Sequence, residues 1–384
     1  MSPTCRRGGK TRLCIVNPSQ HGGGAELQIG YLVSALRQSQ RFEVFYLARH
    51  VNDADRADGY TLVRIGNDGR VPFLGYVADL LPLYRALRTI DPHLIYQRVA
   101  CGYTGICAFY ARRRHARMIW HVAHDTDVTP QTLDTGRNFV RRRLEKLSVQ
   151  YAIPRADCIV AQTHQQGRLL SRFYGREPDA VIANFHPEPS ERIDKSGAPL
   201  VVWIANLKPW KRPDAFVRLA AALRDVDAQF LMVGDCPWGP RHRAWRDALM
   251  QAIGAVPNLR YEGYLPRQEV DALLARATIL VNTSTGEGFP NTFIQAWMRD
   301  TAVVSLSVDP DDVLKSEGVG IFAGSEQRLA SAVRSLLKDP PARAACVARA
   351  QRYVRSRHSL RNAEQLVQLI DGLTLPTPRL AYSA

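Results

Sequence analysis

The chain has 384 residues, of which 46% are apolar and 23% are charged. That length exceeds what one hydrophobic core usually serves, and that composition excludes a disordered chain, so we expect two globular domains. Lysine and arginine outnumber aspartate and glutamate by 51 to 36, a formal charge of +15. Such a surplus favours polyanionic partners: phosphates, nucleic acid or anionic lipid.

The seven cysteines lie far apart, with no C-x-x-C pair and no zinc-site spacing. We interpret them as reduced, mostly buried thiols in a reducing compartment. The basic start, Met1 to Arg12, lacks the apolar run and cleavage site of a signal peptide. The longest uncharged apolar run, Val99 to Ala111, is too short to span a bilayer. We therefore expect a cytoplasmic protein, at most peripheral at the inner face of a membrane.

Along the first half of the chain, strand-like and helix-like runs alternate. The predicted strands are Leu13–Val16, Phe42–Leu47, His93–Tyr96, Met118–Val122 and Cys158–Ala161. The predicted helices are Glu26–Arg37, Val77–Arg88, Cys101–Arg114, Asn138–Ala152 and Gln165–Phe173. This alternation indicates parallel β-α-β units with right-handed crossovers.

A proline-containing, weakly apolar stretch, His186 to Pro199, interrupts the pattern and is typical of a linker. The alternation then restarts, and helical patterning dominates after Ser325. The predicted strands are Leu200–Ala205, Gln229–Val233, Leu259–Tyr261, Thr278–Asn282 and Ala302–Leu306. The predicted helices are Asp214–Leu223, Arg243–Ile253, Gln268–Ala275 and Asn291–Met298.

The pattern predicts an α/β fold of two Rossmann-like parallel-sheet domains facing across a cleft. We place the domains at residues 1–190 and 191–355, followed by a helical tail, 356–384, that crosses back to the first domain. Ligands of such sheets bind outside the carboxyl ends of the strands, so one site in the cleft is expected.

The segment Asn17 to Glu26 (NPSQHGGGAE) follows the first strand and opens a helix. Gly22, Gly23 and Gly24 let the backbone approach a ligand closely, and the helix start adds positive dipole character. Both features suit a diphosphate. The spacing is not G-x-G-x-x-G, which disfavours a nicotinamide cofactor. The alternative is a flexible glycine turn without a ligand.

A second loop, Trp203 to Pro213 (WIANLKPWKRP), clusters Lys208, Lys211 and Arg212 before a helix. Cations at this place can offset a diphosphate and stabilise the charge that develops on it as a glycosidic bond breaks. A solvated basic loop is an equally good interpretation of this segment alone.

A third loop, Thr285 to Trp297 (TGEGFPNTFIQAW), places Glu287 in a glycine-flanked turn before a helix. Its carboxylate can accept hydrogen bonds from sugar hydroxyls, and the nearby backbone N–H groups can bind phosphate or sugar oxygens. Gln295, eight residues later, can face the same cleft. A helix-capping role for Glu287 is the alternative, but it does not explain why Gly, Phe, Pro and Asn crowd one turn.

A fourth segment, Trp120 to Asp127 (WHVAHDTD), ends a strand and puts His124 at the cleft edge, able to hydrogen-bond a sugar. His121, His124 and Asp125 can also be interpreted as metal ligands, and Asp125-Thr-Asp127 matches a metal-binding D-x-D pattern. No further ligands stand at a recognised spacing, and similar aspartate pairs occur twice elsewhere. We predict no metal site.

Together these segments resemble the retaining glycosyltransferases of family 4 (glycosyl transferases group 1), which have the GT-B fold. The most specific part is the E-x7-E region, here Glu287 to Gln295, and Asn184 in V-I-A-N-F is similar to the family's stretch before the linker. The catalytic residues that the resemblance implies are Glu287, Lys211 and His124. The donor-binding residues that it implies are Gly23, Gly24, Asn206, Lys208, Tyr264, Leu265, Gly288, Phe289, Pro290, Asn291, Thr292 and Gln295.

Two positions depart from the family pattern. Asn206 stands where the family usually has an arginine on the diphosphate, and Lys208 can replace that cation. Gln295 stands where a second glutamate usually contacts the nucleotide ribose, and an amide can still hydrogen-bond both hydroxyls.

The resemblance implies a hexosyltransferase that needs neither metal nor cofactor and takes its sugar from a nucleoside diphosphate sugar. The diphosphate leaves, and the acceptor hydroxyl attacks from the same face with retention. The second domain would hold the donor and the first the acceptor, a glycan or lipid-linked glycan of polysaccharide biosynthesis. The alternatives are a nucleotide-sugar-binding pseudoenzyme and a sugar-nucleotide epimerase of the same fold. A nucleic-acid-binding protein is disfavoured because no such signature is present.

The charge surplus sits on the acceptor side. Residues 1–190 carry 26 basic and 16 acidic residues, a balance of +10, against 25 and 20, or +5, in the rest. The predicted helix Asn138 to Tyr151 puts Val140, Leu144, Leu147 and Tyr151 on one face among several arginines. Such a helix can lie on an anionic membrane or pack its apolar face onto its own sheet.

Overall fold

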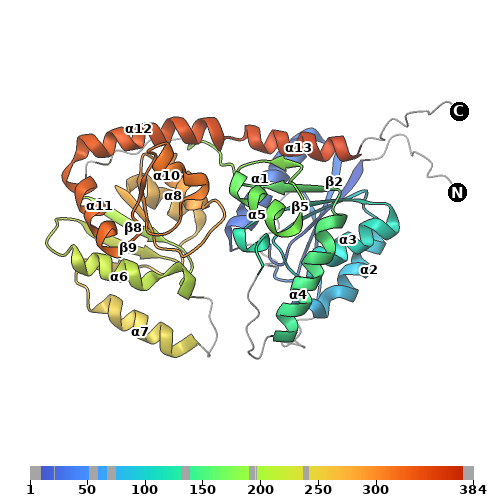
Figure 1. Ribbon diagram of the computed structural model, residues 1–384, viewed down its shortest axis with the longest axis horizontal. Helices are drawn as coiled ribbons and strands as arrows, with labels where there is room; N and C mark the ends of the chain where they lie inside the picture. Colours follow the sequence, from blue (N-terminus) through green and yellow to red (C-terminus); the bar gives the residue numbers. More distant parts are fainter. Residues whose placement is uncertain are drawn as a thin grey trace, which may run out of the picture. The chain divides into compact units, whose positions relative to one another are not determined.

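The computed structural model describes residues 10–20, 22–51, 59–66, 75–130, 139–189, 195, 197–236 and 242–374. The chain divides into two compact units, the first made of Met1–Phe185 and Leu360–Ala384 and the second of His186–Ser359. Each unit is built around one parallel sheet (Figure 1), which confirms the predicted α/β fold of two Rossmann-like domains. The predicted linker, His186 to Pro199, lies partly outside the described residues.

The sheet of the first unit has seven strands in the order β3-β2-β1-β4-β5-β6-β7, and all neighbours pair in parallel. The strands are β1 Thr11–Val16, β2 Phe42–Ala48, β3 Thr61–Arg64, β4 Leu94–Arg98, β5 Arg117–His121, β6 Cys158–Ala161 and β7 Ala180–Val181. Successive side chains of β1 enter opposite layers, because Leu13 and Ile15 pack in one buried cluster and Cys14 and Val16 in the other.

Helices cover both faces of this sheet. They are α1 Gly24–Ser39, α2 Leu80–Ile90, α3 Gly102–Arg114, α4 Phe139–Ala152, α5 His164–Tyr174 and the C-terminal α13 Arg361–Thr374. One face packs against α2 to α5 and the other against α1 and α13. The chain leaves the unit at Phe185, whose backbone N–H and C=O are both hydrogen-bonded by the buried amide of Gln28 at 3.0 and 2.9 Å.

The second unit repeats the plan with six parallel strands in the order β10-β9-β8-β11-β12-β13. They are β8 Leu200–Ile204, β9 Gln229–Val233, β10 Leu259–Tyr261, β11 Ile279–Asn282, β12 Ala302–Ser305 and β13 Ile321–Phe322. The helices are α6 Pro213–Ala222, α7 Arg243–Gly254, α8 Arg267–Arg276, α9 Asn291–Trp297, α10 Val313–Ser316, α11 Glu326–Lys338 and α12 Pro340–Arg357.

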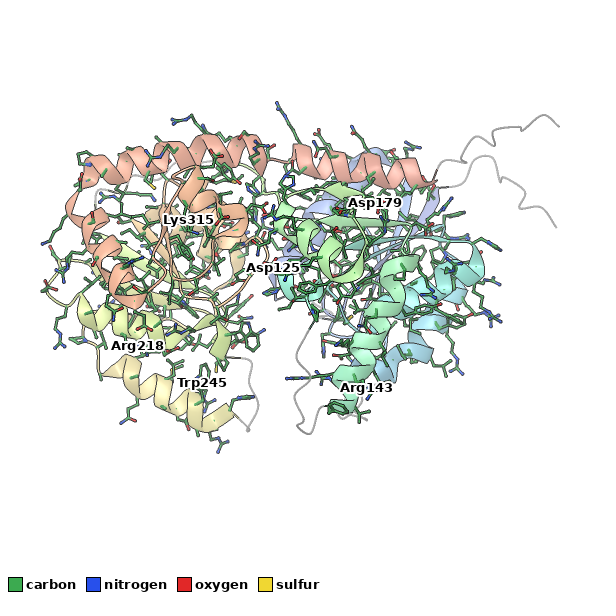
Figure 2. All side chains as sticks on the ribbon, in the orientation of Figure 1. Asp125, Arg143, Asp179, Arg218, Trp245 and Lys315 are labelled. Carbon is green, nitrogen blue, oxygen red and sulfur yellow. The ribbon has the colours of Figure 1, made fainter. Side chains whose placement is uncertain are left out.

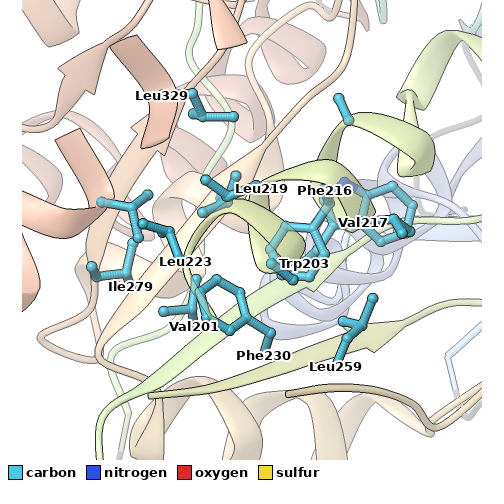
Figure 3. Close-up of a cluster of buried hydrophobic side chains, with 14 of the residues drawn as sticks. Val201, Trp203, Phe216, Val217, Leu219, Leu223, Phe230, Leu259, Ile279 and Leu329 are labelled. Carbon is cyan, nitrogen blue, oxygen red and sulfur yellow. The ribbon is translucent and has the colours of Figure 1, made fainter. Parts of the chain in front are cut away.

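The second sheet is also buried on both faces. One layer joins its strands to α6, α7 and α11 around Trp203, Phe216 and Phe230 (Figure 3). The other layer joins them to α8, α9, α10 and α12 around Phe293 and Trp297. Figure 1 shows α6 and α7 on one side of β8 and β9, with α8 and α10 on the other.

Both sheets have the doubly wound strand order, in which the chain reverses direction across the sheet beside the first strand of the unit. The reversal lies between β1 and β4 in the first unit and between β8 and β11 in the second. Loops that leave the carboxyl ends of these paired strands diverge to opposite faces, which leaves room for a ligand between them.

The predicted elements match closely, and Gln229–Val233 and Leu259–Tyr261 have the predicted bounds. The elements that the sequence analysis missed are short: β3, β7, β13 and α10. Residue 138, the predicted start of α4, lies outside the described residues, and α4 is described from Phe139.

Candidate functional site

Two loops meet at the reversal point of the second sheet. One follows β8 and contains the short 3-10 turn Pro209–Lys211, and the other follows β11 and runs from Thr283 to Pro290. The N–H of Thr285 donates to the carbonyl of Trp210 at 2.8 Å. The predicted basic loop and the predicted E-x7-E loop are therefore direct neighbours.

Thr283 fixes the backbone at the tip of the basic loop. It is fully buried, and its Oγ1 lies 2.7 Å from the carbonyl of Lys211 and 2.8 Å from that of Arg212. The indole N–H of Trp203 donates to the Oγ1 of Thr283 at 2.8 Å. Arg212 adopts a left-handed conformation with φ 49°, so the chain turns sharply just after Lys211.

The side chains of Lys211 and Glu287 form an ion pair through Nζ and Oε1. Both are largely shielded, with side-chain exposures of 20% and 14%. Arg212 points elsewhere, because its guanidinium binds Glu326 at 2.5 Å. Bonds from Arg218 and Arg212 lower the pKa of Glu326 to about 2. Lys211 is thus the cation of its cluster that the fold directs at Glu287.

A glycine lets the β8 loop lie close to the end of β9. Gly234 has φ 151°, and a Cβ added there would lie 1.7 Å from the carbonyl oxygen of Ala205. The N–H of Leu207 also donates to the carbonyl of Asp235 at 2.8 Å. Predicted donor residue Asn206 lies half-buried between these contacts.

The other donor residues predicted in this unit differ in exposure. The Nζ of Lys208 lies over the ring of Trp210, 5.2 Å from its centroid. Tyr264 is 68% exposed, next to the partly buried Leu265. Gly288, Phe289 and Pro290 are buried, and Thr292 is half-buried at the start of α9.

Two buried histidines support the loop after Glu287. The Nε2 of His186 lies 3.0 Å from the Oδ1 of Asn291, and the rings of His358 and Phe289 make a tilted contact with their centroids 4.3 Å apart. The N–H of His186 donates to the carbonyl of His358 at 3.0 Å. Residues from the two ends of the second unit therefore hold the turn that carries the predicted site.

Gln295 is buried and makes a specific contact that its sequence position did not reveal. Its amide donates to Asp271 on α8 at 3.1 Å, and Asp271 also pairs with Arg299 at 3.1 Å. A glutamate at position 295 would place two carboxylates in contact. The glutamine, which departs from the family pattern, is therefore complementary to Asp271 in this chain.

In the first unit, Gly23 caps α1 without a side-chain bond, and Gly22 has φ 98°. The Oε2 of Glu26 lies so close that a Cβ on Gly23 would meet it at 2.4 Å, and its Oε1 accepts from Asn17 at 2.8 Å. The carboxylate adds negative charge to the helix start, so an anion bound at Gly23 and Gly24 would need cations from elsewhere.

His124 lies in the loop after β5 with its tautomer defined. The backbone N–H of Thr126 donates to its Nδ1 at 3.1 Å. Because an N–H group can only donate, Nδ1 is the acceptor, and the neutral ring carries its proton on Nε2. His124 can therefore offer a hydrogen bond to a hydroxyl or phosphate oxygen through Nε2.

The D-x-D aspartates are hydrogen-bonded to their own loop and to helix α5. Asp127 is buried and accepts from the N–H groups of Ala123 and His124 at 2.9 and 3.0 Å. Asp125 (Figure 2) accepts from the amides of Gln166 and Gln165 at 3.1 and 3.3 Å. Over the residues for which side chains are described, no group of three or more His, Cys, Asp or Glu is arranged to hold a metal.

A buried polar cluster at the ends of β4 and β5 was missed by the sequence analysis. The Nη2 of Arg98 donates to Asn184 at 2.8 Å, and the hydroxyl of Tyr96 lies 2.7 Å from the Nδ1 of His121. Burial lowers the pKa of His121 well below its ordinary value. The only signal in the sequence was the polar residues that end two otherwise apolar strands.

Two family models match the chain, one for each unit. "Glycosyltransferase Family 4" matches residues 22–188, and "Glycosyl transferases group 1" matches residues 198–339. The D-inositol 3-phosphate glycosyltransferase of Corynebacterium aurimucosum is 25% identical over 350 residues, which are 82% of this chain and 83% of that protein. The lipopolysaccharide core biosynthesis mannosyltransferase LpcC of Rhizobium leguminosarum is 25% identical over 65% of this chain and 76% of its own.

Solved structures share the fold at lower identity. Anabaena Alr3699/HepE in complex with UDP and glucose superposes with a TM-score of 0.77 at 18% identity, covering 94% of this chain and 100% of that one. WaaG, a glycosyltransferase involved in lipopolysaccharide biosynthesis, superposes with a TM-score of 0.76 at 15% identity over 94% and 100%.

The buried contact of His186 predicts that stability falls in acid. Burial lowers the pKa of His186 to about 3 from an ordinary 6.5, so below pH 6.5 the unfolded chain binds a proton that the folded chain does not. The contribution is complete above that pH and is lost as the pH falls toward 3. At pH 5 we expect a loss of about 2 kcal/mol, measured by urea unfolding followed by tryptophan fluorescence.

His186→Gln can keep the bond to Asn291 but does not titrate, so its stability difference between pH 7 and pH 5 should shrink by about 2 kcal/mol. The matched control is His164→Gln, because His164 is exposed. If the His186 variant keeps the full acid sensitivity of the wild type, the proposed cause is wrong.

The contact of Gln295 predicts a penalty for restoring a glutamate. Gln295→Glu should destabilise the protein by about 1–3 kcal/mol at pH 7, because the new carboxylate meets Asp271 without a donated hydrogen bond. The folded state would then bind a proton more tightly than the unfolded state, so stability should recover as the pH falls. Adding Asp271→Asn should restore stability at pH 7. Equal unfolding midpoints for wild type and Gln295→Glu at pH 7 would contradict this.

Proposed function

Since the chain belongs to the glycosyltransferases of group 1, family 4, we propose that it moves a hexose from a nucleoside diphosphate sugar to a hydroxyl with retention of configuration. The observation that carries the proposal is the shielded ion pair of Lys211 and Glu287 at the reversal point of the second sheet. The ammonium of this pair can bind a diphosphate, and the carboxylate in contact with it can accept hydrogen bonds from sugar hydroxyls.

In this mechanism the donor replaces each partner of that pair. The diphosphate takes the place of Glu287 beside Lys211, and the sugar hydroxyls take the place of Lys211 beside Glu287. Thr283 holds the backbone of Lys211 in position beforehand, so little reorganisation accompanies bond cleavage. The Lys211 ammonium then stabilises the charge that develops on the leaving diphosphate, and no metal ion is needed for that step.

The remaining predicted residues take supporting roles. The N–H groups of Gly288, Asn291 and Thr292 face donor oxygens, while Asn206, Lys208, Tyr264, Leu265, Phe289, Pro290 and Gln295 complete the donor site. Gly23 and Gly24 approach the donor through their backbone. His124 donates from Nε2 to the transferred sugar, which its tautomer supports.

We propose a glycan or lipid-linked glycan as the acceptor. Support comes from the relative named for lipopolysaccharide core biosynthesis. The first unit, with its larger positive balance, would serve the acceptor. We place the enzyme in the cytoplasm, peripheral to the inner membrane face. The cysteines in the described residues are free thiols, which suits a reducing compartment.

Lys211→Ala tests this proposal. Because the ammonium acts chiefly on charge that appears during cleavage, kcat should fall by about 10²–10³ while the donor KM changes much less. The measurement is turnover of the nucleoside diphosphate sugar that gives the largest rise in Tm in a panel of donors.

The matched control is Lys338→Ala, an exposed lysine of α11, which should keep wild-type kinetics. Glu287→Gln should lower turnover as well, while the fold keeps its Tm within a few degrees. Wild-type kinetics in Lys211→Ala would remove Lys211 from the mechanism. A donor panel in which no nucleotide sugar raises Tm would remove the proposed donor class.

A further inference from the structure

Helix α4 carries an apolar ridge that stays partly exposed. Val140, Leu144, Leu147 and Tyr151 are 64%, 38%, 51% and 36% exposed. They are spaced by four, three and four residues, so they form one stripe along the helix. The buried residues of the helix lie away from the middle of that stripe, Val149 by roughly 170° and Ala152 by roughly 110° around the axis. The helix therefore has one apolar face for its unit and another that faces outward.

A close contact between α3 and α4 explains why the face of α4 with the smaller side chains is the buried one. The hydroxyl of Ser148 accepts from the N–H of Gly105 at 3.0 Å and donates to the carbonyl of Gly102 at 2.7 Å. A Cβ on Gly105 would lie 2.3 Å from that hydroxyl oxygen. This close contact between α3 and α4 turns Ser148 and Val149 inward and leaves the larger apolar side chains outside.

Beside the ridge the surface is hollowed. A groove of about 570 Å³ runs between α4 and the first residues of α2 and α3, and its lining includes Leu80, Leu144, Leu147 and Tyr151. Its walls are thus mainly apolar side chains, although it is open to solvent. A groove of this kind fits a hydrocarbon chain better than a polar ligand.

Cations flank the same surface. The sequence of α4 holds three arginines and one lysine against a single acid, Glu145. Glu145 pairs with Arg141 at 3.4 Å, and Arg142 and Arg143 are exposed (Figure 2 labels Arg143). One turn further, the guanidinium of Arg155 lies over the ring of Tyr151, 4.1 Å from its centroid.

We propose that this surface of α4 docks the protein on an anionic phospholipid bilayer. The ridge Val140, Leu144, Leu147 and Tyr151 would enter the boundary between headgroups and acyl chains, and the groove would receive part of an acyl chain. The flanking cations would meet the lipid phosphates.

Charge favours a bilayer over a second copy of this chain. A symmetric contact of α4 with itself would bring the same unbalanced cations together. A bilayer offers apolar depth and a sheet of phosphates at once, which is the combination that the ridge and its flanks present. Docking does not depend on the proposed transfer reaction, since binding is measured without donor or acceptor.

The test is cosedimentation of the full chain with vesicles. We expect binding to vesicles of phosphatidylcholine mixed with phosphatidylglycerol, weakening as salt rises, and little binding to phosphatidylcholine alone. Arg142→Gln with Arg143→Gln should weaken partitioning roughly 25-fold, about fivefold for each cation. Leu144→Ser with Leu147→Ser should weaken it at least about tenfold. These four side chains are exposed, so the variants should keep their Tm.

Matched controls come from elsewhere on the chain. Arg352→Gln with Arg355→Gln removes the same charge from exposed positions of α12, and Leu360→Ser removes an apolar side chain that is 44% exposed. Both controls should bind like the wild type. The second readout is tryptophan fluorescence. The Leu147→Trp variant should emit more than the wild type, and brominated lipid should quench that additional emission only in anionic vesicles.

Three outcomes would overturn the proposal. The first is that the wild type does not bind anionic vesicles at low salt. The second is that the charge variants of α12 and α4 lose vesicle binding equally. The third is that brominated lipid does not quench the additional emission of the Leu147→Trp variant. A dimer in solution that Leu144→Ser with Leu147→Ser dissociates, without vesicle binding, would assign the ridge to a second copy. Binding of an acidic protein but not of vesicles would assign it to that class of partner.

Discussion

The candidate chemistry depends on the pairing of one ammonium with one carboxylate, and that pairing depends on strand order. Lys211 and Glu287 are 76 residues apart, and they meet because β8 and β11 are neighbours in the second sheet. The buried hydroxyl of Thr283 then links the β11 loop to the backbone of Lys211. In the proposed reaction this pair, held with little access to water, would exchange its mutual contact for a ligand that carries both a diphosphate and hydroxyls.

Much of this arrangement could be predicted from the sequence because parallel strands buried on both faces are continuous apolar runs. The strand Gln229–Val233 and the strand Leu259–Tyr261 were identified with their observed bounds. Polar loops at the carboxyl ends of such strands then indicate a ligand site from the sequence alone. Two of the three missed strands, Ala180–Val181 and Ile321–Phe322, are each two residues long at a sheet edge, too short to show a period.

The contacts that refine the site could not be predicted, because each joins residues distant in sequence. In the sequence, Gln295 is only a departure from the glutamate of the family pattern. The structure shows that its amide donates a hydrogen bond to Asp271. His186 looked like part of a linker, yet its ring contacts Asn291 at the start of α9. In both cases the local sequence specifies a side chain that can donate or accept, and the tertiary fold decides what it meets. A departure from a family pattern is therefore best judged against its neighbours in space.

Helix α4 shows the limit of periodicity most clearly. The helical period of the sequence identifies the stripe Val140, Leu144, Leu147 and Tyr151 as the apolar face. Packing of this stripe onto the sheet was one of two interpretations of the sequence. The structure buries Val149 and Ala152 instead, because Gly105 of α3 admits Ser148 at backbone contact distance. Backbone proximity outweighs side-chain size here, since the close contact satisfies a backbone N–H and a carbonyl at once. The larger stripe is then left partly exposed among arginines, a combination that fits a partner with both apolar and anionic character.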